Sequence, residues 1–171
     1  KTLHQTWFAS KSLSRNIWSW NKSKRDPIED EKEILDLLKQ ANDKRKAKKY
    51  DEVFAITQKV LDMDSSYLEK AYGMRGLCFL EQDNVDAALE SFQKALRIDP
   101  SVAVNHYYRG CCLVKKQKYS EALDAFDSCI QMDSEFEPAV HNKGVTLAML
   151  NKHTEAIKQF DLAIQLEPED M

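Results

Sequence analysis

The 171-residue sequence has few residues that break helices and no long apolar segment. Glycine and proline occur four times each, and such a composition favours helix over sheet and argues against a long disordered region. No uninterrupted apolar run approaches the roughly 18 residues that a membrane span needs, which excludes a transmembrane segment. The formal net charge is only −3, so the chain has no strong overall field for nucleic acid or a membrane surface.

The sequence also lacks the short motifs of enzymes and cofactor sites. It contains no G-x-x-x-x-G-K-[ST], no G-x-G-x-x-G and no G-x-S-x-G, which would mark phosphate-binding loops, dinucleotide sites and nucleophile elbows. The four cysteines form no C-x-x-C pair, and no cysteine stands at zinc-binding spacing from a histidine. We therefore expect no catalytic residues, no metal and no cofactor.

Acidic residues are absent from residues 1–25, which we call the N-terminal arm. The arm carries six basic residues and all three tryptophans of the chain. Its basic, serine-rich and acid-free composition is typical of a mitochondrial targeting segment, so we predict a mitochondrial location, with a cytoplasmic one as the alternative. A basic tail or a membrane-surface anchor would have similar features. The expected anchoring residues are Trp7, Phe8, Ile17, Trp18 and Trp20.

After the arm, the sequence repeats itself every 34 residues. Gly76, Gly110 and Gly144 stand 34 apart. The same spacing relates three alanines, three phenylalanines and further small or aliphatic residues: Ala88, Ala122 and Ala156; Phe92, Phe126 and Phe160; Ala95, Cys129 and Ala163. Chance does not keep so many positions in phase over three units, and periods of this length indicate a repeat architecture.

Each repeat unit has the pattern of two helices. Apolar residues recur at helical spacing within a unit, and polar breaks at residues 82–84, 116–118 and 151–152 separate the paired helices. Ser66 with Glu69, and Ser134 with Glu137, have the spacing of a capping box. Pro138 suits the first turn of a helix, where its missing N–H costs little.

These positions resemble the tetratricopeptide repeat family. The family pattern places a small residue in the first helix, then Ala, then an aromatic residue, and Pro at the close. Units at 69–102, 103–136 and 137–170 match it, with Ser134 in place of the closing Pro in the middle unit. A more divergent unit at about 34–68 has Thr57 in place of the aromatic and one extra residue. The resemblance implies an all-α, right-handed α-solenoid of antiparallel helix pairs in residues 26–171, with the arm outside the repeats.

The resemblance also implies a groove lined by the first helix of each pair. The repeat register predicts a partner-binding groove formed by Met74, Leu77, Tyr107, Tyr108, Cys111, Val114, Asn142, Val145 and Met149. Cys78, Cys112 and Cys129 are expected to be buried packing thiols, whereas Cys111 should face the groove and could be reactive. The densest basic run, at 44–49, has no interleaved aromatic residues, so we expect no nucleic-acid partner.

One subclass of the family binds the acidic C-terminus of heat-shock chaperones through Lys, Asn and Arg side chains. The corresponding positions here carry Leu38, Asn42, Met74, Val104 and Tyr108, of which only Asn42 fits. A register shifted by one unit fits no better. The chain is therefore not expected to belong to this carboxylate-clamp subclass, and its apolar, aromatic groove should prefer a hydrophobic helix or extended segment.

Two functions follow from these observations, both of them non-enzymatic protein–protein interaction. In the first, the chain is an accessory subunit held in a larger complex by its groove and its arm. In the second, it is a free peptide-binding adaptor. The exposed aromatic area of the arm favours the first, because such area must dock to avoid aggregation. The few acids near the groove indicate that the arm docks on a neighbouring protein rather than in the chain's own groove.

Overall fold

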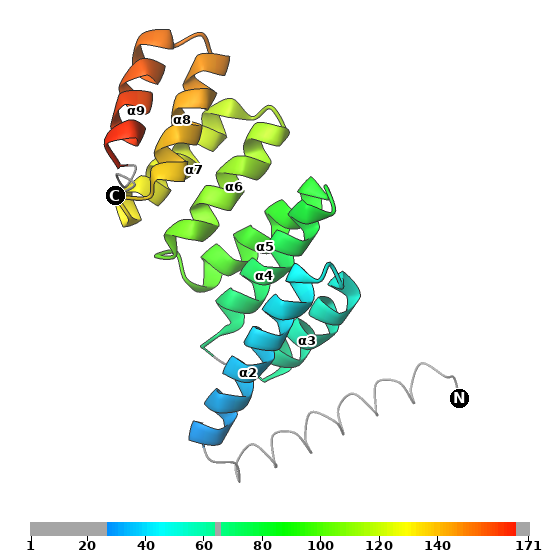
Figure 1. Ribbon diagram of the computed structural model, residues 1–171. Coiled ribbons are helices and arrows are strands. Elements are labelled where there is room, and N and C mark those ends of the chain that lie inside the picture. Colours follow the sequence, from blue (N-terminus) through cyan, green and yellow to red (C-terminus); the bar gives the residue numbers. More distant parts are fainter. Residues whose placement is uncertain (1–26, 64–65, 167–171) are drawn as a thin grey trace, which may run out of the picture. The chain divides into compact units, whose positions relative to one another are not determined.

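A computed structural model describes residues 27–63 and 66–166 as eight α-helices, without any strand in these ranges (Figure 1). The predicted all-α fold of helix pairs is confirmed. The N-terminal arm, with its five anchoring residues, lies outside the described residues. The helices are α2 (Pro27–Lys46), α3 (Tyr50–Asp62), α4 (Leu68–Glu81), α5 (Val85–Ile98), α6 (Ala103–Lys115), α7 (Tyr119–Met132), α8 (Glu137–Met149) and α9 (His153–Leu166).

The chain divides into two units between Asp36 and Leu37, inside helix α2. Residues 27–36 form the first part of α2, where Glu29 and Asp30 stand in the first turn and favour the positive end of the helix dipole. The helix pairs belong to the second unit, which begins at Leu37. No expectation from the sequence placed a boundary inside this helix.

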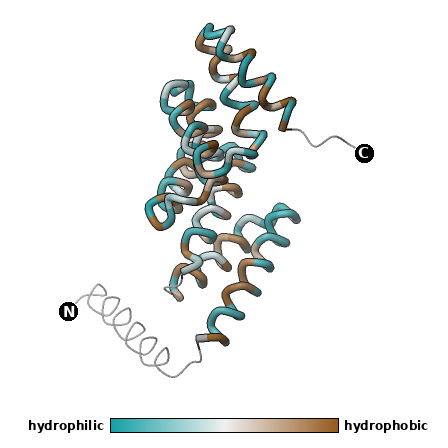
Figure 2. Tube along the Cα trace, turned by 90° about the vertical axis from the view of Figure 1, so that its left-hand side faces the viewer, coloured by the Kyte–Doolittle hydropathy of each residue, from teal (hydrophilic) through white to brown (hydrophobic). Residues whose placement is uncertain are grey.

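Successive helices of the second unit pack against one another in chain order. The pairs α4–α5, α6–α7 and α8–α9 have the most extensive contacts, and α5–α6 and α7–α8 join one pair to the next (Figure 1). Figure 2 shows hydrophobic and hydrophilic residues alternating along these helices. Buried apolar residues from neighbouring pairs contact one another, as in the clusters around Phe126 and Phe92, so stacking the pairs buries the core.

The turn inside each pair is made by one residue with a positive φ. These residues are Lys48, Asp83, Gln117 and Asn151, with φ between 57° and 59°. The last three are 34 residues apart, whereas Lys48 precedes Asp83 by 35, which accounts for the extra residue of the first unit. The left-handed conformation ends one helix and reverses the chain toward the next. The polar breaks expected from the sequence are thus the turns within the pairs.

The repeated glycines bring the two helices of a pair into close contact. A Cβ atom on Gly76 would lie 2.6 Å from the ring of Phe92, and one on Gly110 would lie 2.5 Å from the ring of Phe126. Phe92 and Phe126 have no exposed surface. Because real Cβ atoms are not found so close to a ring carbon, only glycine allows the phenylalanine to lie flat against the first helix.

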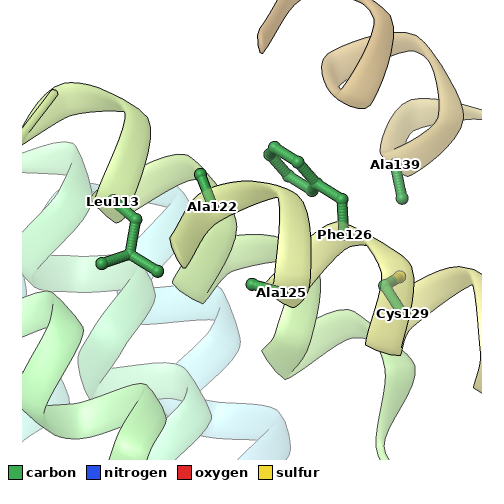
Figure 3. Close-up of a cluster of buried hydrophobic side chains, with 6 residues drawn as sticks. All are labelled: Leu113, Ala122, Ala125, Phe126, Cys129 and Ala139. Atoms are coloured by element: carbon green, nitrogen blue, oxygen red, sulfur yellow. The ribbon is translucent and has the colours of Figure 1, made fainter. Parts of the chain in front are cut away.

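Around Phe126, small side chains complete the contact between three helices. Leu113 comes from α6, Ala139 from α8, and the other members of this cluster, Ala122, Ala125, Phe126 and Cys129, come from α7 (Figure 3). All six are 2% exposed or less. Close packing of this kind is sensitive to added volume. This explains why most of the buried residues packed with the large Phe126 ring are alanine or cysteine.

The first pair lacks this ring contact, and hydrogen bonds join its second helix to the following pair. Thr57 stands where the other units have phenylalanine, and it is fully buried. Arg75 of α4 donates from Nε to Thr57 Oγ1 at 2.9 Å, and from Nη2 to the Phe54 carbonyl at 3.1 Å and to Gln58 Oε1 at 2.9 Å. Arg75 thereby joins α3 to α4, a role that the sequence pattern did not indicate.

The capping boxes expected from the sequence are not formed. Helix α4 begins at Leu68 with Tyr67 at the N-cap, and α8 begins at Glu137 with Phe136 at the N-cap. Neither helix has a capping hydrogen bond from its N-cap side chain. Ser66 therefore lies one residue outside the cap position. Glu69 accepts a hydrogen bond from Asn105 instead. Pro138 does occupy the first turn of α8.

Replacing Gly110 by leucine should destabilise the fold by about 1–3 kcal/mol, because the new side chain overlaps the ring of Phe126. Urea unfolding followed by circular dichroism measures this change. The matched control is Ala55→Leu, at an exposed position of α3, where we expect little effect. Equal stability of both variants would show that the glycine contact does not limit the packing.

Replacing Arg75 by alanine should cost about 1–3 kcal/mol, because it leaves the buried Thr57 hydroxyl and the Phe54 carbonyl without this donor. Arg109 stands at the same repeat position and makes no hydrogen bond or ion pair with the described residues, so Arg109→Ala is the control. Thermal unfolding of the two variants measures the difference. A loss of the same size in both would mean that the arginine side chains contribute only by packing.

Candidate functional site

A pocket of about 350 Å³ opens between α2, α4 and α6 in the second unit. Most of its lining is apolar, and the polar groups are Glu69, Lys70 and Asn105. Gly73 of α4 adds no side chain to the wall. The apolar lining consists of Leu38, Met74, Leu77, Phe92, Val102, Val104 and Tyr108.

Three of the predicted groove residues line this pocket: Met74, Leu77 and Tyr108. The ring of Tyr108 stacks on Phe92 with centroids 5.4 Å apart, which fixes its orientation in the wall. Leu38, Met74, Val104 and Tyr108 stand at four positions where the carboxylate-clamp subclass has polar groups. The pocket is therefore apolar where that subclass binds a carboxylate.

Tyr107, Cys111 and Asn142 form a second cluster, which joins α6 to α8. Asn142 donates from Nδ2 to the Tyr107 hydroxyl at 3.2 Å and to Cys111 Sγ at 3.6 Å. The ring of Tyr107 also packs on Phe136, with centroids 5.2 Å apart. This cluster links neighbouring repeats, and burial raises the pKa of the Tyr107 hydroxyl well above its ordinary value.

The remaining predicted groove residues lie away from the pocket. Val114 packs against the core around Phe126. Val145 is half-buried on α8 and Met149 is 50% exposed near its end. The structure therefore places the predicted groove residues in more than one environment, and only part of the set surrounds the pocket.

The sequence reasoning missed the polar pair inside the pocket. Glu69 is only 9% exposed and Asn105 only 2%, and Asn105 Nδ2 donates a hydrogen bond to Glu69 Oε1. Glu69 and Asn105 stand at the first and third positions of their units, which the repeat register did not assign to the groove. The available signal was a carboxylate and an amide 36 residues apart, at positions where the following units carry Ala103 and Ala139.

Burial raises the pKa of the Glu69 carboxyl above its ordinary value, and the negative charge of Asp99 adds to the effect. The hydrogen bond from Asn105 and the charge of Lys70 act in the opposite direction but do not cancel it. Lys70 makes no ion pair with Glu69. Its ammonium lies 4.9 Å from the centre of the Tyr67 ring. The pocket thus contains a carboxylate whose ionised form is poorly compensated.

The cysteines of the described chain are not arranged for thiol chemistry. Burial raises the pKa of Cys78 and Cys129 to about 11 and that of Cys112 to about 12. Burial also raises the pKa of Cys111, although Tyr107 and Asn142 oppose the shift. Because the thiolate is the reactive form, this raised pKa disfavours reaction at Cys111.

The basic run at 44–49 is largely paired within the chain. Lys44 and Lys49 both contact Glu52, at 2.5 Å and 3.1 Å, and Arg45 forms an ion pair with Glu81. Within residues 27–63 and 66–166, no group of three or more His, Cys, Asp or Glu residues is placed to hold a metal ion. No helix in the described part of the chain is both long and apolar enough to cross a membrane.

Comparison with known proteins identifies the repeats. The tetratricopeptide repeat family model matches residues 69–102 and again residues 138–170. A probable UDP-N-acetylglucosamine–peptide N-acetylglucosaminyltransferase SPINDLY from Solanum lycopersicum is 35% identical over 71 residues, which are 42% of this chain. The match spans only 8% of that relative's length.

Solved structures show the same fold. The crystal structure of MamA has a TM-score of 0.70 at 21% identity, with 78% of each chain covered. The second tetratricopeptide repeat domain of Spaghetti (RPAP3), bound to the HSP90 peptide SRMEEVD, has a TM-score of 0.58 at 24% identity, covering 60% of this chain and 94% of that one. Residues 69–102 and 138–170 are thus tetratricopeptide repeats, and the described chain has the fold of the MamA structure. Its fold is that of a protein-interaction scaffold or adaptor.

Replacing Glu69 by glutamine should stabilise the protein at neutral pH but not at acidic pH. The raised pKa means that the folded state binds a proton more tightly than the unfolded state, so the contribution of Glu69 to stability falls as the pH rises through its pKa. Glutamine keeps the oxygen that accepts from Asn105 and removes the charge. Unfolding by urea at a series of pH values measures the difference.

The matched control for this prediction is Glu137→Gln, two repeats further along at the same position. Glu137 is more exposed, and its side chain makes no hydrogen bond to the described residues, so its replacement should change stability little at any pH. A Glu69→Gln variant that is less stable than the parent at neutral pH would contradict the proposed cost of the buried charge.

Proposed function

We propose that this protein is a peptide-binding adaptor, which holds an apolar helical or extended segment of a partner protein against the first helices of its repeats. The observation that carries the proposal is the pocket of about 350 Å³ between α2, α4 and α6, whose lining is mostly apolar. Recognition sites are typically concave and apolar with a few placed polar groups. The pocket matches that description within a fold that binds other proteins.

The side chains around the pocket suit such a role. Met74 is flexible and polarisable, so it can adapt to different apolar groups. Tyr108 presents an aromatic face held in place by its stacking on Phe92, and tyrosine is enriched among residues that dominate binding energy. A rigid aromatic wall beside an adaptable one favours a segment with apolar side chains.

A role as a subunit of a larger complex is the second candidate, and it rests on helix α9. Ile157, Leu162 and Ile164 of this helix are 59%, 39% and 68% exposed. Large exposed apolar side chains grouped on one helix often mark a protein contact. The location in mitochondria remains a prediction from the arm, which lies outside the described residues.

We propose no catalytic role for the chain. The relative that carries a transferase name is matched only over 8% of its length, and tetratricopeptide repeats are binding modules. The groups with shifted pKa values in the pocket, Glu69 and Tyr108, are shifted first by burial, as expected for residues in the wall of an apolar cavity.

Selection of a random 12-residue peptide library displayed on phage against the immobilised full chain tests the adaptor proposal. Selected peptides should bind the protein in calorimetry, and Tyr108→Ala should weaken them by about 2 kcal/mol, or roughly 30-fold, if Tyr108 is an interface hot spot. Far-UV circular dichroism checks that the variant keeps its helices.

Tyr119→Ala is the matched control, because Tyr119 is a half-buried tyrosine on α7 that does not line the pocket. It should leave peptide binding unchanged. Failure to select any peptide, or equal binding to the Tyr108 variant, would overturn the proposal. Peptides that still bind the Tyr108→Ala variant but do not bind the Ile164→Glu variant would favour the α9 surface instead.

A further inference from the structure

The Glu69–Asn105 pair has no evident structural need in this fold. The equivalent first position of the next unit is Ala103, and the equivalent third positions are Ala71 and Ala139. Ala71 and Ala139 are fully buried, so an apolar residue satisfies the packing at the third position. The last unit carries Glu137 at the first position, but this side chain is more exposed than Glu69, and its third position is Ala139. The buried pair of carboxylate and amide therefore indicates a local requirement of the pocket.

We propose that the pocket is a subsite for one lysine side chain of the bound segment, with its ammonium at Glu69 and Asn105. The inference rests on the proposed function and adds the chemistry of the ligand to it. The occupant is therefore a partner segment with a lysine among apolar residues.

The charge of the Glu69 carboxylate favours a cationic ligand. Glu69 is 9% exposed and forms no ion pair with any residue of the described chain. The ammonium of the adjacent Lys70 lies over the Tyr67 ring, and Asp99 adds a second negative charge nearby. A cation brought by a ligand would compensate a charge that Asn105 and Lys70 compensate only in part.

The open acceptors favour an ammonium over a guanidinium. Asn105 Nδ2 already donates to Glu69 Oε1, so Glu69 Oε2 and Asn105 Oδ1 are the oxygens without a hydrogen bond in the described structure. Arginine binds best to both oxygens of one carboxylate in parallel. Lysine carries three donors on a compact group, which suits two acceptors on different residues.

Space for the ligand comes from Gly73. A Cβ atom there would lie 3.1 Å from Asn105 Oδ1 and 3.8 Å from Glu69 Oε1, so the glycine keeps the α4 backbone beside the polar pair uncovered. The same repeat position carries Tyr107 and His141 in the next two units. Gly73 does not belong to the series of glycines that contact phenylalanine, and its place in the pocket lining gives it a separate role.

The apolar lining matches the rest of a lysine side chain. Leu38, Met74 and Leu77 line the same pocket as Glu69, and a lysine can lay its four methylene groups along apolar surface while its charge reaches a polar group. A neutral chain of the same length would fill the apolar part but leave the carboxylate desolvated. The pocket should therefore discriminate between lysine and norleucine.

Nuclear magnetic resonance of the full chain, with ¹³C-methyl-labelled methionine, tests this subsite directly. The probe is N-acetyl-lysine N-methylamide, and N-acetyl-norleucine N-methylamide is the neutral analogue. The Met74 methyl resonance should shift with the lysine probe until the site is saturated. The affinity for the norleucine analogue should be lower by about tenfold or more. Met132, exposed on α7, serves as the internal control and should not shift.

Glu69→Gln should reduce the affinity for the lysine probe by about tenfold or more, because it removes the charge and keeps the acceptor for Asn105. Glu137→Gln should leave the affinity unchanged. Circular dichroism confirms that both variants fold. A residue needed only for structure would not change the ratio between lysine and norleucine.

Three results would overturn the proposal: equal binding of norleucine, unchanged affinity in Glu69→Gln, or tighter binding of N-acetyl-arginine N-methylamide. The outcome is separable from the proposed function. If selected peptides depend on Tyr108 but the lysine probe does not bind, the adaptor role stands and the subsite is wrong. If the lysine probe binds and no peptide is selected, the cation site stands and the binding of a partner segment is wrong.

Discussion

The contact between a glycine of one helix and a phenylalanine of the next sets the geometry of the helix pairs. Each ring lies where a single Cβ atom on the facing helix would be 2.5–2.7 Å from it. Because the contact returns every 34 residues, each pair has the same separation and presents a similar face to the next pair. Stacking then needs only small residues where one pair contacts the next, such as Ala139 of α8 against the cluster around Phe126.

The first repeat shows that the phenylalanine ring can be absent when a neighbouring residue compensates. Thr57 takes the place of the ring, and the space and hydrogen-bonding capacity are satisfied by Arg75 from the following repeat. A local departure in one unit is thus compensated by a side chain of its neighbour. This coupling between adjacent repeats is characteristic of solenoids, in which each unit is stabilised by the units beside it.

The pocket is formed by a different departure from the repeat pattern. Gly73 stands where the next two units have large side chains, and Asn105 stands where its neighbours have alanine. Glu69 is buried, whereas Glu137 at the same position of the last unit is more exposed. Because burial raises the pKa of Glu69, we expect its ionised form to lower stability at neutral pH, a cost that an apolar side chain would not carry. Proteins commonly accept a loss of stability where a site must bind a ligand. The pocket thus differs from the surrounding core in containing a carboxylate in a mostly apolar lining.

The sequence by itself determined the helix pairs, their turns and their close contacts, because these depend on residues in phase at a fixed spacing. It also predicted that Met74, Leu77 and Tyr108 lie on one surface, and all three line the pocket. The tertiary structure alone decided that Glu69 meets Asn105 across two helices, that Arg75 reaches Thr57, and that no capping box forms at Ser66. These contacts join side chains from different units, and their partners depend on where each helix begins and how deeply it is buried. A repeat register gives the direction of a side chain but not its environment, so the charge inside the pocket became visible only when the helices were placed together.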